Sequence, residues 1–248
     1  MDNFINLTAE NIDEQHLCCI IRSKIAHPGV ETKRKWLKQR IQEGHVFRKL
    51  DTKATAFIEY APLETAWVPI EGDNYLYIYC LWVDGEFKGH GYGKALMDYC
   101  IKDARKKKKS GICLLGAKKQ KHWLTNQEFA KRYGFEVVDS TNSGYELLAL
   151  SFDESKPKFT AKAKKEIIKD KALTIYYDDQ CPFIKQKIEN LQDYCQKNRI
   201  PLSLNYINSL KKAKNVPCVF NNYAVFYEGK FQTVNLLEIT QVERMITS

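Results

Sequence analysis

The sequence predicts an α/β protein with two domains, and three observations lead to this prediction. An apolar and aromatic run at 75–83 precedes alternating glycines and a helical pattern, as expected of a buried strand followed by a loop and a helix. A polar, lysine-rich segment at 155–171 separates two stretches of different pattern. The second stretch alternates strands and helices. With 248 residues, 44% of them apolar, each domain can bury its own core.

Periodicity and turn residues place the elements of the first domain, residues 1–154. Strands are expected at 5–7, 46–50, 54–59, 66–70, 75–83, 112–116, 136–139 and 145–152. Helices are expected at 13–24, 31–43, 94–108 and 126–133. This mixture predicts a mixed α/β domain.

The second domain, residues 172–248, follows the basic linker 155–171. In the linker, Thr160 is expected to cap a short helix that runs through Ile168. Beyond it, strands are expected at 172–177, 202–207, 219–227 and 230–234, and helices at 184–197 and 236–246. The last two strands form a predicted hairpin through Glu228 and Gly229.

Segment patterns and cysteine spacing exclude several classes of protein. No window approaches about eighteen consecutive apolar residues, and the N-terminus lacks the regions of a secretory signal, so we expect a cytoplasmic protein without a membrane span. The eight cysteines are scattered, with no CxxC pair and no Cys/His cluster. We therefore expect neither a disulfide framework nor a metal site.

The net charge of +9 is concentrated in the second part of the chain. Residues 1–155 carry +2 and residues 156–248 carry +7. Seven lysines lie between Lys156 and Lys171, but this segment has no arginine and a single aromatic residue, Phe159. A solvated linker explains this pattern better than a nucleic-acid patch, where arginine and aromatic residues usually accompany lysine.

The glycine loop after the 75–83 strand is the most informative motif. Gly89, Gly91 and Gly93 alternate directly before a helix, where backbone N–H groups can converge on an anion such as a pyrophosphate. The spacing G-x-G-x-G differs from the dinucleotide fingerprint, and Ala95 after Lys94 differs from the Ser or Thr of a Walker A loop.

The stretch from Val83 through Lys88 to Gly93 resembles motif A of the GNAT N-acetyltransferases, with the valine, the lysine and the three glycines at the spacing of that motif. This resemblance implies a GNAT fold with a mixed central sheet, acetyl-CoA as co-substrate and a small-molecule amine as acceptor. It implies that strand backbone groups hold the pantetheine and thioester, and that the loop holds the pyrophosphate. The implied cofactor-binding residues are Leu81, Trp82, Val83, Lys88, Gly89, His90, Gly91, Tyr92, Gly93 and Lys94. Lys88 replaces the usual Arg or Gln, although its charge suits a phosphate.

The downstream motif of the family matches less fully. Phe129, Gly134 and Phe135 fit, but Ala130 stands where many members have a tyrosine that protonates the departing thiolate. Tyr133 would point about 60° away around the helix. The catalytic residues therefore stay unassigned, with Glu59, Glu64, Cys80 and Tyr133 as candidates for assisting proton transfer.

A single cysteine between a strand and a helix marks the second domain. Cys181-Pro182-Phe183 resembles the active-site motif of thioredoxin-like proteins, with Ile184 in place of the resolving cysteine, and Val216-Pro217 resembles their Val-cis-Pro segment. Together the two halves resemble the bacterial YoaP-type acetyltransferases. Cys181 could contact a substrate or metal, act alone in redox chemistry or be inert. We expect Cys181 and Cys218 to remain reduced, and Cys181 to react fastest with alkylating agents.

Three hypotheses on function follow from the sequence. The leading one is an acetyl-CoA-dependent N-acetyltransferase that transfers the acetyl group directly to an amine. The alternatives are an acyl-CoA-binding module without turnover, suggested by Ala130, and a thiol-handling protein that uses Cys181. No membrane partner is expected, and the sequence leaves open whether the chain forms a homodimer.

Overall fold

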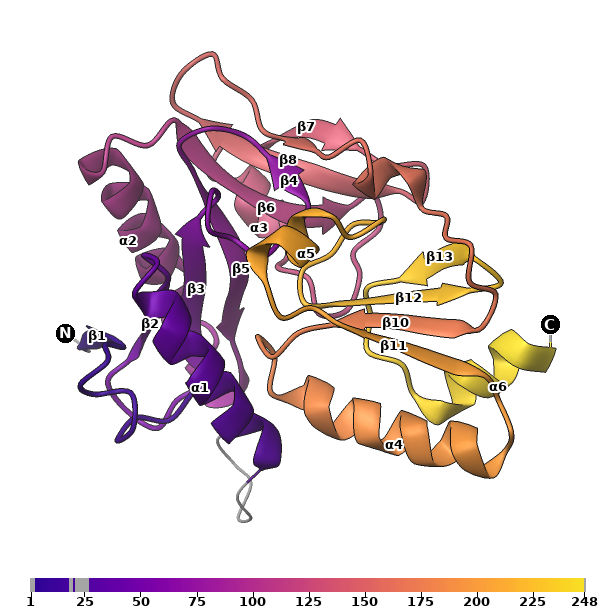
Figure 1. Cartoon of the computed structure of the whole chain (residues 1–248). Coiled ribbons are helices and arrows are strands. Elements are labelled where there is room, and N and C mark those ends of the chain that lie inside the picture. The colour runs from indigo at the N-terminus through magenta and orange to yellow at the C-terminus, as the bar shows by residue number, and fades with distance from the viewer. Residues whose placement is uncertain (1–2, 18–19, 21–26, 248) are drawn as a thin grey trace. The chain divides into compact units, whose positions relative to one another are not determined.

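The computed structural model describes residues 3–17, 20 and 27–247 (Figure 1). The chain divides into two compact units, each described here by itself. Unit 1 comprises Met1–Ala26, Arg34–Ala66 and Ile70–Lys158, and unit 2 comprises His27–Lys33, Trp67–Pro69 and Phe159–Ser248. Among the described residues, no helix combines the length and the apolar character that a membrane crossing requires.

Unit 1 is built on a seven-stranded mixed sheet with the strand order β1-β2-β3-β5-β6-β8-β7. The strands are β1 (Phe4–Asn6), β2 (Val46–Leu50), β3 (Ala56–Pro62), β5 (Tyr75–Val83), β6 (Gly111–Ala117), β7 (Glu136–Ser140) and β8 (Tyr145–Ser151). The pair β5–β6 is parallel and its neighbours on both sides are antiparallel. The expected mixed central sheet is confirmed, and every residue of β6 is buried.

The helices of this part of the chain are α1 (Pro28–Ile41), α2 (Tyr92–Lys106) and α3 (Gln127–Lys131), with a short 3-10 helix η1 at Gly85–Phe87. Helix α2 buries Leu96, Met97, Cys100 and Ala104 along one face, at the spacing of an amphipathic helix. These side chains pack on the sheet in a core that also contains Ile78. The sheet and α2 therefore fix the position of the loop between them.

The ladder between β5 and β6 ends before either strand does. Pairing runs from Tyr75↔Gly111 to Ile78↔Leu114, whereas β5 continues to Val83. On its other side, β5 has a bulge, because Glu59 pairs with Cys80 but Tyr60 pairs with Ile78. Tyr79 is thus the extra residue, and such bulges bend a strand and increase its twist. The last residues of β5 are consequently directed away from β6.

Unit 2 has a four-stranded sheet with the order β11-β10-β12-β13. Its elements are β10 (Leu173–Tyr177), α4 (Phe183–Lys197), β11 (Leu202–Tyr206), α5 (Leu210–Lys214), β12 (Tyr223–Tyr227), β13 (Lys230–Thr233) and α6 (Ile239–Thr247). The pair β10–β11 is parallel, and β12 runs antiparallel to β10 and β13. Residues of α4 and α6 share one core with the sheet, and α5 lies across the sheet from them (Figure 1).

The predicted hairpin of unit 2 is confirmed. Glu228 and Gly229 connect β12 and β13 with φ values of 52° and 75°. A two-residue turn of type I′ requires positive φ at both of these positions. Most predicted strands and helices match the observed ones within a few residues. Helix α5 was not predicted, and β12 begins at Tyr223 rather than at 219.

Two predictions for the first domain are wrong in the described residues. The part of the expected helix 13–24 that the structure describes forms turns and irregular backbone, and residues 18–19 and 21–24 lie outside the described residues. Asn11 explains the turns, because its side chain accepts from the Thr8 N–H at 2.8 Å and donates to the Asn6 carbonyl at 3.0 Å. The expected strand 66–70 is reduced to β4 (Ile70–Glu71), which pairs with β9 (Lys158–Phe159).

The expected helix from Thr160 to Ile168 is also wrong. Thr160 does cap a turn, accepting from the Ala163 N–H at 3.1 Å, but only a 3-10 helix η2 (Ala163–Lys165) follows. The next residues bind distant backbone instead, since the Ile168 N–H donates to the Gly229 carbonyl at 2.8 Å and Ile167 bridges to Lys230. These long-range hydrogen bonds replace the local bonds of a helix.

Candidate functional site

A cavity of about 740 Å³ in unit 1 lies where β5, the glycine loop and the start of α2 meet. Nine of the ten residues expected to bind the cofactor line it, and His90 is the exception. The lining residues are Leu81, Trp82, Val83, Phe87, Lys88, Gly89, Gly91, Tyr92, Gly93, Lys94, Gln120, Lys121, His122, Trp123, Leu124, Thr125, Asn126, Phe129 and Arg132. The structure therefore brings the strand end and the loop together in one concave site.

The glycines of the loop have two different structural roles. Gly89 and Gly91 have φ values of 84° and 78°, a backbone conformation that other residues adopt at a cost. Gly91 is the N-cap of α2, so the unpaired N–H groups at this helix start lie in the loop. Gly93 is helical, and a Cβ there would lie 3.7 Å from Phe129 Cζ. Its missing side chain leaves room at the cavity wall.

Four cationic side chains line the cavity, those of Lys88, Lys94, Lys121 and Arg132, and the first two form ion pairs. Lys88 Nζ lies 2.9 Å from Asp84 Oδ1, and Lys94 Nζ lies 2.6 Å from Asp98 Oδ2. The hydrogen bond to Asp98 and the charge of that carboxylate raise the pKa of Lys94. Exposed pairs of this kind are weak because solvent screens them, so both lysines can turn toward an anion in the loop.

The opposite wall of the cavity was missed in the sequence analysis, apart from Phe129. It consists of the loop 120–126 together with Phe129 and Arg132. Gln120 holds this loop, because its Nε2 donates to the Leu124 carbonyl at 3.1 Å, and Asn126 Oδ1 caps α3 by accepting from the Phe129 N–H at 2.9 Å. The Asn126 cap was a recognisable signal, but the loop has no periodicity that predicts its position.

The C-terminal end of β5, Leu81–Val83, forms a hydrogen bond with a side chain of this wall. The backbone N–H of Leu81 donates to Thr125 Oγ1 at 3.3 Å, in the part of β5 that lies beyond its ladder with β6. Backbone groups of Leu81, Trp82 and Val83 therefore lie beside an open space rather than beside another strand on that side. Such groups can form hydrogen bonds with an extended ligand.

The structure does not place Tyr133 in the cavity lining. Ala130 is fully buried in the core, and Tyr133 packs behind Phe129, with ring centroids 5.2 Å apart. Burial and the charge of Asp98 raise the pKa of the Tyr133 hydroxyl. The substitution of tyrosine by alanine at 130 is therefore not compensated by Tyr133 among the residues described around the cavity.

The other candidates for proton transfer also lie outside the cavity lining. Glu59 is completely buried and forms a hydrogen bond of 3.0 Å with His45 Nε2. Glu64 accepts from the Asn74 N–H at 2.7 Å, which supports a turn. Cys80 pairs with Glu59 across the β3–β5 ladder and is partly buried. The structure thus gives Glu59 and Glu64 structural contacts.

Cys181 of unit 2 lies just before the N-terminus of α4. Cys181 is partly buried, whereas Cys218 is buried, and burial raises the pKa of the Cys218 thiol well above its usual value. The structure has no disulfide at either residue. No cis peptide bond occurs in the described residues, so the Val216–Pro217 bond is trans and the resemblance to a Val-cis-Pro segment is wrong at this point.

Comparison with protein families agrees with this architecture. Residues 14–135 match the acetyltransferase (GNAT) family, and residues 201–244 match the YoaP-like family. Over 247 residues the chain is 34% identical to a protein of Bacillus subtilis (strain 168) named uncharacterized N-acetyltransferase YoaP. The match covers 99% of this chain and 98% of that one.

Solved acetyltransferase structures align with part of the chain. The PaiA N-acetyltransferase from Thermoplasma acidophilum, solved in complex with coenzyme A, is 15% identical and covers 60% of this chain and 99% of its own, with a TM-score of 0.40. YncA of Salmonella typhimurium, described as an acetyltransferase with its cofactor acetyl-CoA, is 12% identical and covers 62% and 95%, with a TM-score of 0.41.

The buried pair of His45 and Glu59 generates a prediction on stability. Replacing His45 by Leu should lower the free energy of unfolding by roughly 1–3 kcal/mol, because the Glu59 carboxylate then loses a hydrogen bond inside the core. Urea unfolding of His45→Leu, Glu59→Leu and the double variant measures the coupling of the two side chains. If the losses of stability in the two single variants simply added up in the double variant, the two side chains would not be coupled, and the structural role assigned to the pair would be wrong.

Proposed function

Because the chain belongs to the GNAT family of acetyltransferases, whose acyl donor is acetyl-CoA, we propose that it is an N-acetyltransferase acting on the amine of a small molecule. The observation that carries the proposal is the cavity at the end of β5, where an open strand edge, a glycine loop and a helix N-terminus meet. The open strand edge suits the pantetheine arm with its thioester, and the glycine loop together with the helix start suits the pyrophosphate.

We place the pyrophosphate of acetyl-CoA in the loop from Lys88 to Lys94. Backbone N–H groups at the start of α2 point into this loop, and the positive end of the helix dipole favours an anion there. Lys88 and Lys94 add two mobile charges. The pantetheine arm would extend along Leu81–Val83 on the side that β6 leaves open. It would form hydrogen bonds with the β5 backbone there, as a neighbouring strand does elsewhere in the sheet.

The proposed chemistry is direct transfer. The lone pair of a neutral amine attacks the thioester carbonyl carbon, the C–S bond breaks, and coenzyme A leaves as a thiolate. The amine proton passes to water, and water or solvent buffer protonates the thiolate. Backbone N–H groups beside the thioester stabilise the negative oxygen, and fixed positioning of the two reactants lowers the barrier further.

A screen for transfer tests this proposal directly. Purified protein is incubated with acetyl-CoA and panels of amino acids, polyamines, aminoglycosides and other amines, and release of coenzyme A is measured together with the mass of the acetylated product. We expect at least one amine to gain an acetyl group faster than acetyl-CoA hydrolyses. Binding of acetyl-CoA without any product across the panels would favour a module without turnover.

For the C-terminal part we propose a thioredoxin-like domain at residues 172–248, joined by the linker 155–171 to an acetyltransferase domain at 1–154. The support is the succession of a parallel strand–helix–strand unit, a hairpin and a final helix, with the sheet order β11-β10-β12-β13. Cys181 precedes the helix of the first unit, the position of the reactive cysteine in that fold.

A charge placed in the glycine loop should prevent binding of acetyl-CoA. Replacing Gly91 by Glu should weaken binding by about a hundredfold or more, because a carboxylate would repel the pyrophosphate at the helix start. Gly144→Glu is the matched control, since Gly144 also has a positive φ, 83° against 78°, and open space around its Cβ position. Calorimetry giving equal losses for both variants would contradict the assignment of the loop.

The position of Tyr133 behind Phe129 predicts that it is not the general acid. Tyr133→Phe should change kcat on an identified acceptor by less than about threefold, whereas loss of a general acid costs about a hundredfold or more. Steady-state kinetics across the pH range measures this difference. A hundredfold loss at neutral pH with an unchanged KM for acetyl-CoA would show that Tyr133 supplies the proton.

The reactivity of Cys181 tests the proposed thioredoxin-like arrangement. Iodoacetamide should label Cys181 before Cys80, because the N-terminus of α4 favours the thiolate of Cys181, and both residues are partly buried. Peptide mapping after short exposure measures the order of labelling. Faster labelling of Cys80, or a Cys181–Cys218 disulfide under mildly reducing conditions, would contradict this reading of unit 2.

A further inference from the structure

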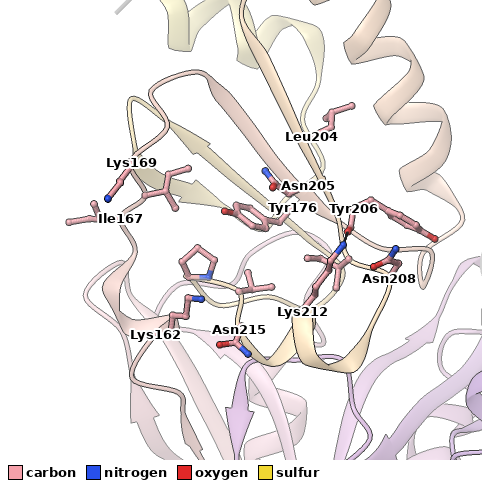
Figure 2. A pocket seen from close by; sticks show the side chains of 14 residues that line it. Lys162, Ile167, Lys169, Tyr176, Leu204, Asn205, Tyr206, Asn208, Lys212 and Asn215 are labelled. Atoms are coloured by element: carbon pink, nitrogen blue, oxygen red, sulfur yellow. Dashed lines mark hydrogen bonds between the residues drawn. The ribbon is translucent and has the colours of Figure 1, made fainter.

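A second cavity, of about 670 Å³, lies within unit 2 beside α5. We propose that it binds a small organic anion, namely a carboxylate or phosphate ester with an apolar body. Its fourteen lining residues come from the linker, β10, β11 and the segment that contains α5, and they are drawn in Figure 2. The volume lies within the range of about 300–1,000 Å³ that is usual for small-molecule sites. The proposal does not depend on the acetyl transfer assigned to unit 1.

The short helix α5 explains why this cavity exists. One face of the sheet is covered by α4 and α6, whose core includes Leu173, Ile175 and Tyr177. Side chains alternate along a strand, so Tyr176 and its cross-strand partner Asn205 lie on the opposite face. Helix α5 has only five residues and leaves these two side chains accessible from the cavity (Figure 2).

The charge around the cavity has a single sign. Lys162 and Lys169 come from the linker and Lys212 from α5, and their side chains surround Tyr176 from different sides (Figure 2). None of the fourteen residues that the structure describes around the cavity is acidic. Three ammonium groups without a lining carboxylate create a positive potential that attracts an anion and repels a cation.

Two carboxylates outside the lining act on its tyrosines: burial together with the charge of Asp170 raises the pKa of Tyr176, and Asp179 is bonded to Tyr206. Asp179 accepts a hydrogen bond from the Tyr206 hydroxyl, and burial raises the pKa of Asp179. Lys212 Nζ lies 3.5 Å from the Tyr206 carbonyl, a long contact at the limit of a hydrogen bond. That contact is weak enough for Lys212 to turn toward a bound anion.

The rest of the lining is apolar or carries amides. Ile207, Val216 and Pro217 provide apolar surface, and Asn205, Asn208 and Asn215 provide amide groups. A ligand with an apolar body and one charged end fits this division, since the body can pack on the apolar wall and on the Tyr176 ring. A concave site of this size favours a small molecule over a nucleic-acid strand, which would need an open groove.

The proposal also gives the linker lysines a function. The sequence alone favoured a solvated segment for the seven lysines from Lys156 to Lys171. Because residues 166–168 bind the hairpin of unit 2 instead of forming a helix, Lys162 and Lys169 are held on both sides of that attachment, at the cavity. The attachment to the hairpin thus holds these two lysines at one site.

The experiment uses the full chain and three probes that differ in charge. Binding of phenyl phosphate, benzoate and benzylamine is measured by titration calorimetry and by saturation-transfer NMR. All measurements are made in the Gly91→Glu background, so that the glycine loop of unit 1 does not contribute and failure of the acetyl-CoA assignment stays separate. We expect saturable binding of phenyl phosphate or benzoate and none of benzylamine.

Variants then locate the site. The triple change Lys162→Gln, Lys169→Gln and Lys212→Gln should weaken binding of the anionic probe by about tenfold or more. A matched triple change at Lys185, Lys197 and Lys211, which do not line the cavity, should leave it within about twofold. Tyr176→Ala should weaken binding without altering the charge, and thermal unfolding checks that each variant folds.

Three outcomes would overturn the proposal. These are binding of benzylamine as strong as that of phenyl phosphate, equal losses in the two triple variants, or no saturable binding of either anion. A single-stranded RNA oligomer serves as the last probe. If it bound through the same three lysines while the small anions did not bind, the surface would be a nucleic-acid site instead.

Discussion

The early end of the β5–β6 ladder is the constraint on which the rest of unit 1 depends. Two parallel strands in the middle of a sheet normally pair along their whole length, because unpaired backbone groups are costly when buried. Here the bulge at Tyr79 redirects β5 after Ile78, and the Leu81 N–H finds a side-chain acceptor in Thr125. The strand edge is thereby left open to a ligand instead of to β6.

A buried polar group lies directly behind this bulge. Glu59, the partner of Cys80, pairs with His45, whose ring lies 5.2 Å from the Tyr79 ring and 5.3 Å from that of Trp36. A carboxylate at such a position costs several kcal/mol unless its charge is paired. The pairing fixes the side chains around the bulge in one arrangement, so the direction of the β5 tail is set by the core as well as by its backbone.

The sequence predicted the parts of the fold whose signals are local. The apolar run of β5, the amphipathic face of α2 and the turn at Gly229 are each readable within a few residues. The loop 120–126 was not predicted, because its position depends on single hydrogen bonds such as that of Gln120 to Leu124. The prediction of a helix in the linker was wrong for the same reason, since hydrogen bonds to the distant hairpin decide the conformation of this segment.

The two cavities differ in how they can recognise an anion. In unit 1 the positive potential combines backbone N–H groups at a helix start, which glycine conformations hold in place, with the side chains of Lys88, Lys94, Lys121 and Arg132. In unit 2 it comes from three flexible lysine side chains around a tyrosine ring. Exposed side-chain charges are screened over about 8 Å at physiological ionic strength, and the field of a helix end is screened by salt as well. Replacing the lining lysines should therefore remove the positive potential of the unit 2 cavity, whereas the glycine loop would keep its backbone N–H groups after the same change. This difference distinguishes the two sites in one intact chain.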